Sequence, residues 1–291
     1  MAPIDETPGL EDTADAGLLA VLLLATVQGL AEFLPISSSG HLALGRALLD
    51  MREAGLPFDV ALHVGTLGAV VWAYRKDVLA LIRDVCAGRF ALFLWLVVAS
   101  IPAAAVGFGF GDVFEDLAER PRAAGCGLLV TAALLLLGDR AQRKASAAQA
   151  PADPGMSNDP SALHADAPLP GWGTAVWVGV AQSLALFPGV SRSGSTIVAA
   201  LMRSVPAGQA ARLSFLMSLI AVGGAAILKL PDAVDSGFQG VAPVHVALGA
   251  LLAGVVGWMA LRTLLLVLRR GALRWFALYC AILGTVALAV G

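Results

Sequence analysis

The feature that most constrains this chain is a thirteen-residue segment that occurs twice. QGLAEFLPISSSG at residues 28–40 returns as QSLALFPGVSRSG at residues 182–194, with seven identical positions and a constant offset of 154 residues. Both copies interrupt apolar stretches with Pro, Gly and Ser, residues that break helices. Paired broken helices of this kind are typical of membrane proteins built from inverted repeats, in which the freed helix ends bind a ligand near the bilayer midplane.

The two copies differ at two positions that carry charge. Glu32 aligns with Leu186, and Ser38 aligns with Arg192. The first copy therefore contributes a carboxylate and the second copy a guanidinium. Because neither copy holds both groups, the sequence predicts one polar site shared by the two copies.

Composition indicates that the bilayer is the solvent of this chain. Hydrophobic residues make up 58% of the 291 residues and charged residues only 14%, which is far from the balance of a soluble domain. A net charge of −2 gives no sign of a nucleic-acid partner, and none is expected. The three cysteines have no paired spacing, which argues against a disulfide framework or a metal cluster. Composition leaves homo-oligomerisation open.

Apolar runs long enough to cross the hydrocarbon core predict six spanning helices. They lie near 57–75, 92–111, 122–138, 211–229, 244–268 and 272–290. The other apolar segments, 17–50 and 172–204, contain the repeat, and each is predicted to enter and leave by the same face. Irregular backbone at membrane depth must be buried, so both hairpins should lie inside the bundle. The predicted fold is an all-α polytopic membrane protein, an inverted-topology repeat with six spanning helices and two re-entrant broken-helix hairpins.

The distribution of Lys and Arg predicts the orientation in the membrane. Twelve of these residues fall in loops on one side and five on the other, where they are mixed with acidic residues. The richer side is predicted to be cytoplasmic, which sends the first hairpin in from outside, the second in from the cytoplasm, and leaves both termini outside. The chain then divides into an acidic N-terminal tail, a first membrane repeat, a flexible cytoplasmic linker and a second membrane repeat, at 1–16, 17–140, 141–171 and 172–291.

The first hairpin combines a carboxylate with several polar side chains. Gln28 and Glu32 are four residues apart, so they share one face of the first half-helix. Pro35 ends that half-helix. The next half-helix is predicted to begin with three N-cap candidates and an imidazole, Ser37, Ser38, Ser39 and His41. A carboxylate inside a membrane segment is costly, so Glu32 is predicted to be functional.

The second hairpin supplies a guanidinium. Pro188–Gly189 makes the break, and the next helix start is occupied by Ser191, Arg192, Ser193, Ser195 and Thr196. Helix N-termini attract anions, and a planar guanidinium suits phosphate oxygens, so two opposed N-termini with an arginine predict a phosphate site. His63 lies on a spanning segment without an evident charged partner, and the sequence favours a packing role for it.

These segments resemble a known family. QGLAEFLPISSSGH is similar to the glutamate-rich first motif of the undecaprenyl-diphosphate phosphatase family, the bacitracin-resistance type, and PGVSRSGST is similar to its serine–arginine motif. FDVALHVGTLGAVVWAYRKD and the pattern of spans extend the resemblance over most of the chain. The first motif of the family opens with Glu or Gln. Gln28 stands at that place, so Glu32 must act as the lone carboxylate of the motif.

The resemblance implies an activity and a location. Undecaprenyl diphosphate would be hydrolysed to undecaprenyl phosphate and inorganic phosphate in the cell inner (plasma) membrane, which recycles the lipid carrier for cell-wall synthesis. A divalent cation, Mg²⁺ or Ca²⁺, is implied, with Glu32 and Gln28 as candidate ligands. The candidate catalytic residues are Glu32, His41, Arg192 and Ser38. The candidate substrate-binding residues are Gln28, Ser37, Ser39, Ser191, Ser193 and Thr196. The nucleophile stays open between Ser38, His41 and water.

The main rival is a transporter or flippase of a lipid phosphate, because broken helices in inverted repeats are its usual architecture. Such a protein would bind the lipid phosphate without cleaving it. A lipid phosphatase with an SR-x5-H signature is excluded, because the sixth residue after Arg192 is Val198 rather than His.

The predicted orientation can be tested by cysteine labelling from the outer face, in a background that lacks the three native cysteines. Positions in 112–120 and 231–242 should react, because they lie on the side with fewer Lys and Arg. Positions in 76–90 and 141–170 should not react. Labelling of the 141–170 region from outside in intact cells would contradict the orientation and the inverted hairpins with it.

Overall fold

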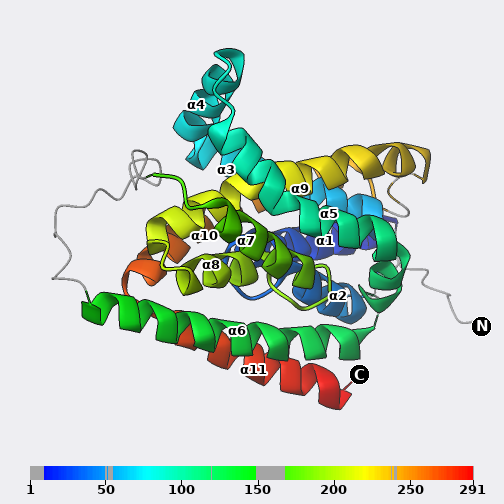
Figure 1. The fold of residues 1–291 in the computed structure, drawn as a ribbon. Helices are drawn as coiled ribbons and strands as arrows, with labels where there is room; N and C mark the ends of the chain where they lie inside the picture. Colours follow the sequence, from blue (N-terminus) through cyan, green and yellow to red (C-terminus); the bar gives the residue numbers. More distant parts are fainter. Residues whose placement is uncertain are drawn as a thin grey trace, which may run out of the picture.

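The structure, a computed structural model, describes residues 10–49, 51, 55–118, 120–148, 168–236, 238 and 241–290. Over this part of the chain the fold contains eleven helices and no strand (Figure 1). In chain order they are α1 (Leu10–Phe33), α2 (Ser38–Leu48), α3 (Gly55–Ala73), α4 (Arg75–Cys86), α5 (Ala91–Ala118), α6 (Pro121–Ala148), α7 (Trp172–Leu184), α8 (Arg192–Met202), α9 (Ala207–Ser236), α10 (Pro243–Arg269) and α11 (Leu273–Val290).

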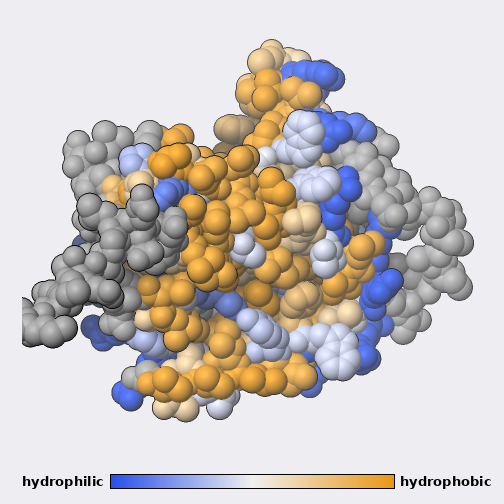
Figure 2. Space-filling model, turned by 180° about the vertical axis from the view of Figure 1, so that it is seen from behind, coloured by the Kyte–Doolittle hydropathy of each residue, from blue (hydrophilic) through white to orange (hydrophobic). Residues whose placement is uncertain are grey.

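Five helices in the described ranges are long and apolar enough to cross a membrane, and the chain is a multi-pass membrane protein. These are the whole of α5, α10 and α11, with Pro121–Lys144 of α6 and Ala207–Lys229 of α9. They coincide with five of the six predicted spans. The sixth predicted span corresponds to a shorter apolar helix, Pro57–Ala73 within α3, and its crossing stays a prediction. Figure 2 shows apolar side chains covering most of one face of the molecule.

The two broken segments are helix pairs, as the repeat predicted. The first is α1 followed by α2, and the second is α7 followed by α8. In α8 every residue from Ser193 to Leu201 is buried, whereas in α2 only Gly40 and Leu42 are buried. The expectation that both hairpins lie inside the bundle is therefore met by most of α8 and by the start of α2, whereas α7 exposes large side chains such as Trp172 and Trp177.

Helices distant in the sequence pack in matching pairs. Helix α1 packs on α10, and α7 packs on α5. Helix α3 contacts both α9 and α10, α5 contacts α9, and α6 lies along α11 (Figure 1). The two helices that precede the breaks are thus each held by a long membrane helix from the other half of the chain.

Helical structure extends beyond the predicted boundaries. Helix α4 forms where the sequence predicted a loop, because apolar residues in 78–85 recur at helical spacing. Its Asp77 makes a buried ion pair with Arg212 of α9 at 2.6 Å. Helix α6 continues through 141–148, into the predicted linker, where Gln142 donates to the carbonyl of Leu268. Helix α1 likewise begins inside the predicted tail. Residues 1–9 and 149–167 lie outside the described residues, and flexibility of the linker stays a prediction.

The break between α7 and α8 depends on two close glycines. Gly189 has a φ of 87°, a left-handed conformation that other residues adopt at a cost. Gly127 of α6 packs directly against this turn. A Cβ atom built on Gly127 would overlap the carbonyl oxygen of Pro188 and lie 2.8 Å from the Cα of Gly189. The absence of side chains at both positions lets α6 touch the break.

Gly127→Ala should therefore destabilise the protein by about 1–3 kcal/mol, because the added methyl group must displace backbone. The measurement is thermal unfolding in detergent, and Gly109→Ala in α5 is the matched control, since a Cβ there meets nothing within 4 Å. Equal unfolding temperatures for the two variants would contradict the tight contact between α6 and the break.

Candidate active site

The two helices that follow the breaks begin in the same way. Ser37 is the N-cap of α2, and its hydroxyl accepts a hydrogen bond from the backbone N–H of Gly40 at 3.4 Å. Ser191 is the N-cap of α8, and its hydroxyl accepts from the N–H of Gly194 at 3.1 Å. These residues are equivalent in the sequence repeat. The prediction that the serine clusters cap new helices is confirmed, with Ser37 as the cap among the three candidates.

The two breaks touch each other. A Cβ built on Gly40 would lie 3.1 Å from the Cα of Gly189, and one built on Gly194 would lie 3.3 Å from the side chain of Pro35. The hydroxyl of Ser193 also lies 3.5 Å from the backbone carbonyl of Leu34. The N-termini of α2 and α8 are therefore brought together, which places two sets of free backbone N–H groups in one region.

Glu32 and Arg192 meet at this junction. Nη2 of Arg192 lies 2.5 Å from Oε1 of Glu32, and the two side chains are 15% and 7% exposed. Glu32 is in the last turn of α1, and Arg192 is the first residue of α8. The carboxylate of the first repeat thus pairs with the guanidinium of the second. Each charge offsets the desolvation cost of the other.

Three further polar groups contact the second carboxylate oxygen of Glu32. Oε2 accepts hydrogen bonds from Nε2 of Gln28 at 3.1 Å and from the hydroxyl of Ser38 at 2.8 Å. Nε2 of His63 lies 3.4 Å away. The structure therefore brings together three predicted site residues and one residue, His63, that the sequence assigned to packing.

Arg192 is supported from the side opposite to Glu32. Its Nη1 lies 3.5 Å from the backbone carbonyl of Ser214, whose hydroxyl is 2.7 Å from that of Thr196. Thr196 in turn donates to the carbonyl of Arg192 at 2.8 Å. Thr196 is fully buried. It holds the start of α8 in place, and its contact with substrate stays a prediction.

The imidazole of His41 is held between α2 and α11. Its Nδ1 lies 2.8 Å from the carbonyl oxygen of Ser37, and its Nε2 lies 2.7 Å from the hydroxyl of Tyr279. The two rings are also stacked, with centroids 5.6 Å apart. Both ring nitrogens are thus engaged with α2 and α11, an arrangement that fixes the start of α2.

Thr131 shapes the second break, and no sequence pattern points to it. The hydroxyl of Thr131, on α6, donates to the carbonyl of Gly189 and accepts from the N–H of Ser191, both at 2.9 Å. A single threonine in an apolar span carries no pattern that would have revealed this role.

The predicted substrate-binding serines lie in pairs. Ser191 and Ser193 are buried, with their hydroxyls 3.2 Å apart. Ser39 lies 3.3 Å from Ser37 through the same kind of contact.

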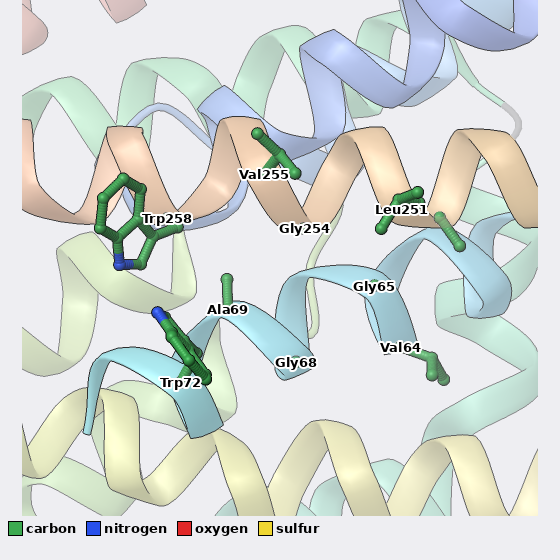
Figure 3. Close-up of a pocket in the computed structure, with 10 residues that line it drawn as sticks. Val64, Gly65, Gly68, Ala69, Trp72, Leu251, Gly254, Val255 and Trp258 are labelled. Carbon is green, nitrogen blue, oxygen red and sulfur yellow. The ribbon is translucent and has the colours of Figure 1, made fainter. Parts of the chain in front are cut away.

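Two cavities lie on opposite sides of α3. Glu32 and Arg192 line a narrow crevice together with Thr66 of α3, and this crevice has no room for a water molecule. A larger groove of about 500 Å³ lies between α3 and α10 (Figure 3). Its walls are apolar, and Figure 3 shows Trp72 and Trp258 at the same end of it, one from each helix. The polar crevice and the apolar groove therefore share one helix and face different directions.

The site offers oxygen atoms to a hard cation. Oε1 of Gln28 is buried and has no hydrogen-bond partner within the described part of the chain. The Glu32 carboxylate lies one turn further along the same helix. No group of three or more His, Cys, Asp or Glu side chains arranged to hold a metal occurs among the described residues. A cation at this place would thus take two protein ligands, and phosphate oxygens and water would complete its coordination.

Comparison with known proteins places the chain among similar sequences. The family described as "Bacitracin resistance protein BacA" matches residues 21–286, a range that includes both breaks. The chain is 37% identical over 289 residues to an undecaprenyl-diphosphatase of Desulfatibacillum aliphaticivorans, covering 93% of this chain and 97% of that protein.

Two other relatives are similar to the chain over nearly their whole lengths. It is 38% identical over 274 residues to an undecaprenyl-diphosphatase of Rubrobacter xylanophilus, covering 90% of this chain and 94% of the relative. It is 37% identical over 268 residues to undecaprenyl-diphosphatase 4 of Bacillus thuringiensis, covering 92% and 95%.

Proposed function

The chain belongs to the bacitracin resistance protein BacA family, and we propose that it hydrolyses undecaprenyl diphosphate to undecaprenyl phosphate and inorganic phosphate. The relatives described above are named undecaprenyl-diphosphatases. One structural observation supports this activity independently of the names of the relatives. Glu32 and Arg192, which come from different repeats, lie in direct contact where two helix N-termini meet. This arrangement combines a base with an anion-binding site, which are the two functions that hydrolysis of a phosphoanhydride needs.

The terminal phosphate would be bound by Arg192 and the helix starts. A guanidinium has five N–H donors, and Glu32 engages only one side of the Arg192 fork. The first backbone N–H groups of a helix have no partner within the helix, so the starts of α2 and α8 favour negative charge. Positioning and charge neutralisation are the main contributions of a protein to phosphoryl transfer, so these groups suit a terminal phosphate.

Glu32 would serve as the base. The hydroxyl of Ser38 donates to Oε2 of Glu32 at 2.8 Å. The attacking hydroxyl, from Ser38 or from a water molecule in its place, would therefore be hydrogen-bonded to the carboxylate that accepts its proton. As the attacking oxygen bonds to the terminal phosphorus, its proton passes to Glu32. The bond from that phosphorus to the bridging oxygen breaks, and undecaprenyl phosphate leaves with the electron pair. If Ser38 attacks, water then hydrolyses the phosphoserine. His41 acts in this scheme as a support of α2.

A divalent cation is the cofactor that we propose for this site. Gln28 and Glu32 would hold it through the free Oε1 atom and the carboxylate. When bound, Mg²⁺ or Ca²⁺ would neutralise charge on the diphosphate oxygens. Gln28 then has two roles, because its Nε2 orients Glu32 while its Oε1 stays available.

The architecture behind this site is an inverted repeat in the inner membrane. Three features support it: the sequence repeat, the equivalent N-caps Ser37 and Ser191, and the matched packing of α1 on α10 and α7 on α5. In this arrangement α3 would be the sixth spanning helix, and both termini would lie outside. The large apolar surface fits the lipid that carries the substrate (Figure 2).

Release of phosphate by the purified protein tests this function against the transporter alternative. In detergent with Mg²⁺ or Ca²⁺, the protein should release inorganic phosphate from a polyprenyl diphosphate. Glu32→Ala and Arg192→Ala should each lower the rate by at least about 10²-fold, since each removes a group that the transition state needs. Arg192→Lys should also lose most activity, because a single ammonium cannot reproduce the fork.

Matched controls come from charged residues that are distant from the crevice. Glu115 pairs with Lys229, and its side chain is 52% exposed. Arg89 pairs with Asp84, and its side chain is 67% exposed. Glu115→Ala and Arg89→Ala should keep the rate of the unmodified protein. Tight binding of the lipid diphosphate without any phosphate release would overturn the phosphatase assignment and favour a transporter.

A further inference from the structure

The apolar groove between α3 and α10 takes no part in the chemistry proposed above. It holds about 500 Å³, within the range of roughly 300–1,000 Å³ that is typical of small-molecule sites. Three of the apolar side chains that line it are exposed, namely Val64, Leu251 and Val255. The groove therefore opens on the outside of the helix bundle, where a membrane protein meets lipid.

One end of the groove combines aromatic rings with positive charge. Trp72 of α3 and Trp258 of α10 lie there together (Figure 3). Cζ of Arg75 is 5.2 Å from the ring centroid of Trp72, and Cζ of Arg262 is 4.1 Å from that of Trp258. Both distances are those of cation–π contacts. The two indole rings therefore hold two guanidinium groups beside the same end of the groove.

These two arginines are exposed, and neither forms an ion pair with a carboxylate among the residues that the structure describes. Arg262 lies inside the apolar span of α10, and the uncharged residues 263–268 separate it from Arg269. A charge within a membrane segment normally faces a partner or a polar cavity. Because Arg262 is exposed instead, an anion from its surroundings has to compensate its charge.

Helices α3 and α10 run in the same direction along the groove (Figure 3). Both Trp72 and Trp258 lie toward the C-terminal ends of their helices, and in the orientation proposed above these ends face the cytoplasm. Trp side chains are enriched at the level of lipid headgroups, and long arginine side chains reach toward that level from within the membrane. The cytoplasmic leaflet carries anionic lipids, so the end of the groove with positive charge would face the leaflet with negative charge.

We propose that this groove binds an anionic phospholipid of the surrounding bilayer. Its acyl chain lies between α3 and α10, and its phosphate binds Arg75 and Arg262 beside the two indole rings. The site is separate from the crevice of Glu32 and Arg192, which lies on the opposite side of α3. The proposal therefore goes beyond the phosphatase activity and does not depend on it.

Charge complementarity favours this occupant over two others. A second copy of the chain that packed here about a two-fold axis would bring the same arginines of both copies together, without an acid to pair them. The prenyl chain of the substrate would fill the apolar part of the groove. Its diphosphate would be bound at Arg192, however, which leaves Arg75 and Arg262 without an anion.

Lipid retention by the full-length protein tests the proposal. The protein is reconstituted in nanodiscs of phosphatidylglycerol and phosphatidylcholine in equal amounts and extracted again in mild detergent. Mass spectrometry then gives the amount of each lipid that stays with the protein, and phosphatidylglycerol should be retained in preference. Combining Arg75→Gln with Arg262→Gln should lower this preference by about fivefold for each arginine removed, which is the effect of one basic residue beside an anionic membrane surface.

A matched control removes two positive charges from other exposed positions on the predicted cytoplasmic side. Arg89→Gln combined with Arg203→Gln should leave the lipid preference unchanged. An unchanged preference in the Arg75 and Arg262 variant would overturn the proposal. An equal loss in both double variants would also overturn it, because the preference would then follow the total charge rather than the groove.

A second variant fills the groove itself. Gly68 lines it, and a Cβ atom there meets nothing within 4 Å, so Gly68→Leu adds a side chain without displacing protein atoms. It should lower the amount of retained phosphatidylglycerol, whereas Gly109→Leu in α5, where the space is equally open, should not. Thermal unfolding in detergent checks that both variants are folded, and the arginine variants decide the matter if Gly68→Leu is not.

Two results with Gly68→Leu would replace the phospholipid by another occupant. Unchanged lipid retention with a raised KM for a polyprenyl diphosphate would overturn the proposal in favour of the substrate chain. Unchanged lipid retention with conversion of a dimer into monomers, measured by light scattering, would overturn it in favour of a second copy.

Discussion

The ion pair between Glu32 and Arg192 is the contact on which the site depends. A charge inside a membrane protein is costly unless a partner or a ligand compensates it. Glu32 ends the first half-helix of one hairpin and Arg192 begins the second half-helix of the other, so pairing them draws the two breaks together. The N-termini of α2 and α8 lie together at this contact, where the hydroxyl of Ser193 is also 3.5 Å from the carbonyl of Leu34. A diphosphate that enters this junction meets a cation, free N–H groups and a base.

Much of this arrangement could be predicted from the sequence because it is encoded locally. The repeat at 28–40 and 182–194 defines both breaks, and Ser37 and Ser191 cap the helices that follow. The roles of His63 and Thr131 could not be predicted, since each depends on how α3 or α6 packs against a break. Helical spacing also failed to reveal where the imidazole of His41 would point, because its direction is set by Tyr279, 238 residues further along the chain.

The two hairpins share equivalent N-cap serines and differ in chemistry. Gln28 and Gln182 are equivalent in the repeat and both are buried. Gln28 donates to Glu32, whereas neither polar atom of the Gln182 side chain has a hydrogen-bond partner in the described ranges. Leu186 stands where the second copy would need an acid. One hairpin therefore supplies the proton chemistry and the other supplies the anion-binding arginine, so catalysis requires both.

The most direct test of this account is a double-mutant cycle on kcat/KM for phosphate release, with Glu32→Gln, Arg192→Lys and the combined variant. If the two residues act as one unit across the hairpins, the combined variant should lose about as much activity as the worse single variant, because either change already disrupts the shared site. If the two losses multiply, the residues act independently, and the claim that their contact builds the active site would be contradicted.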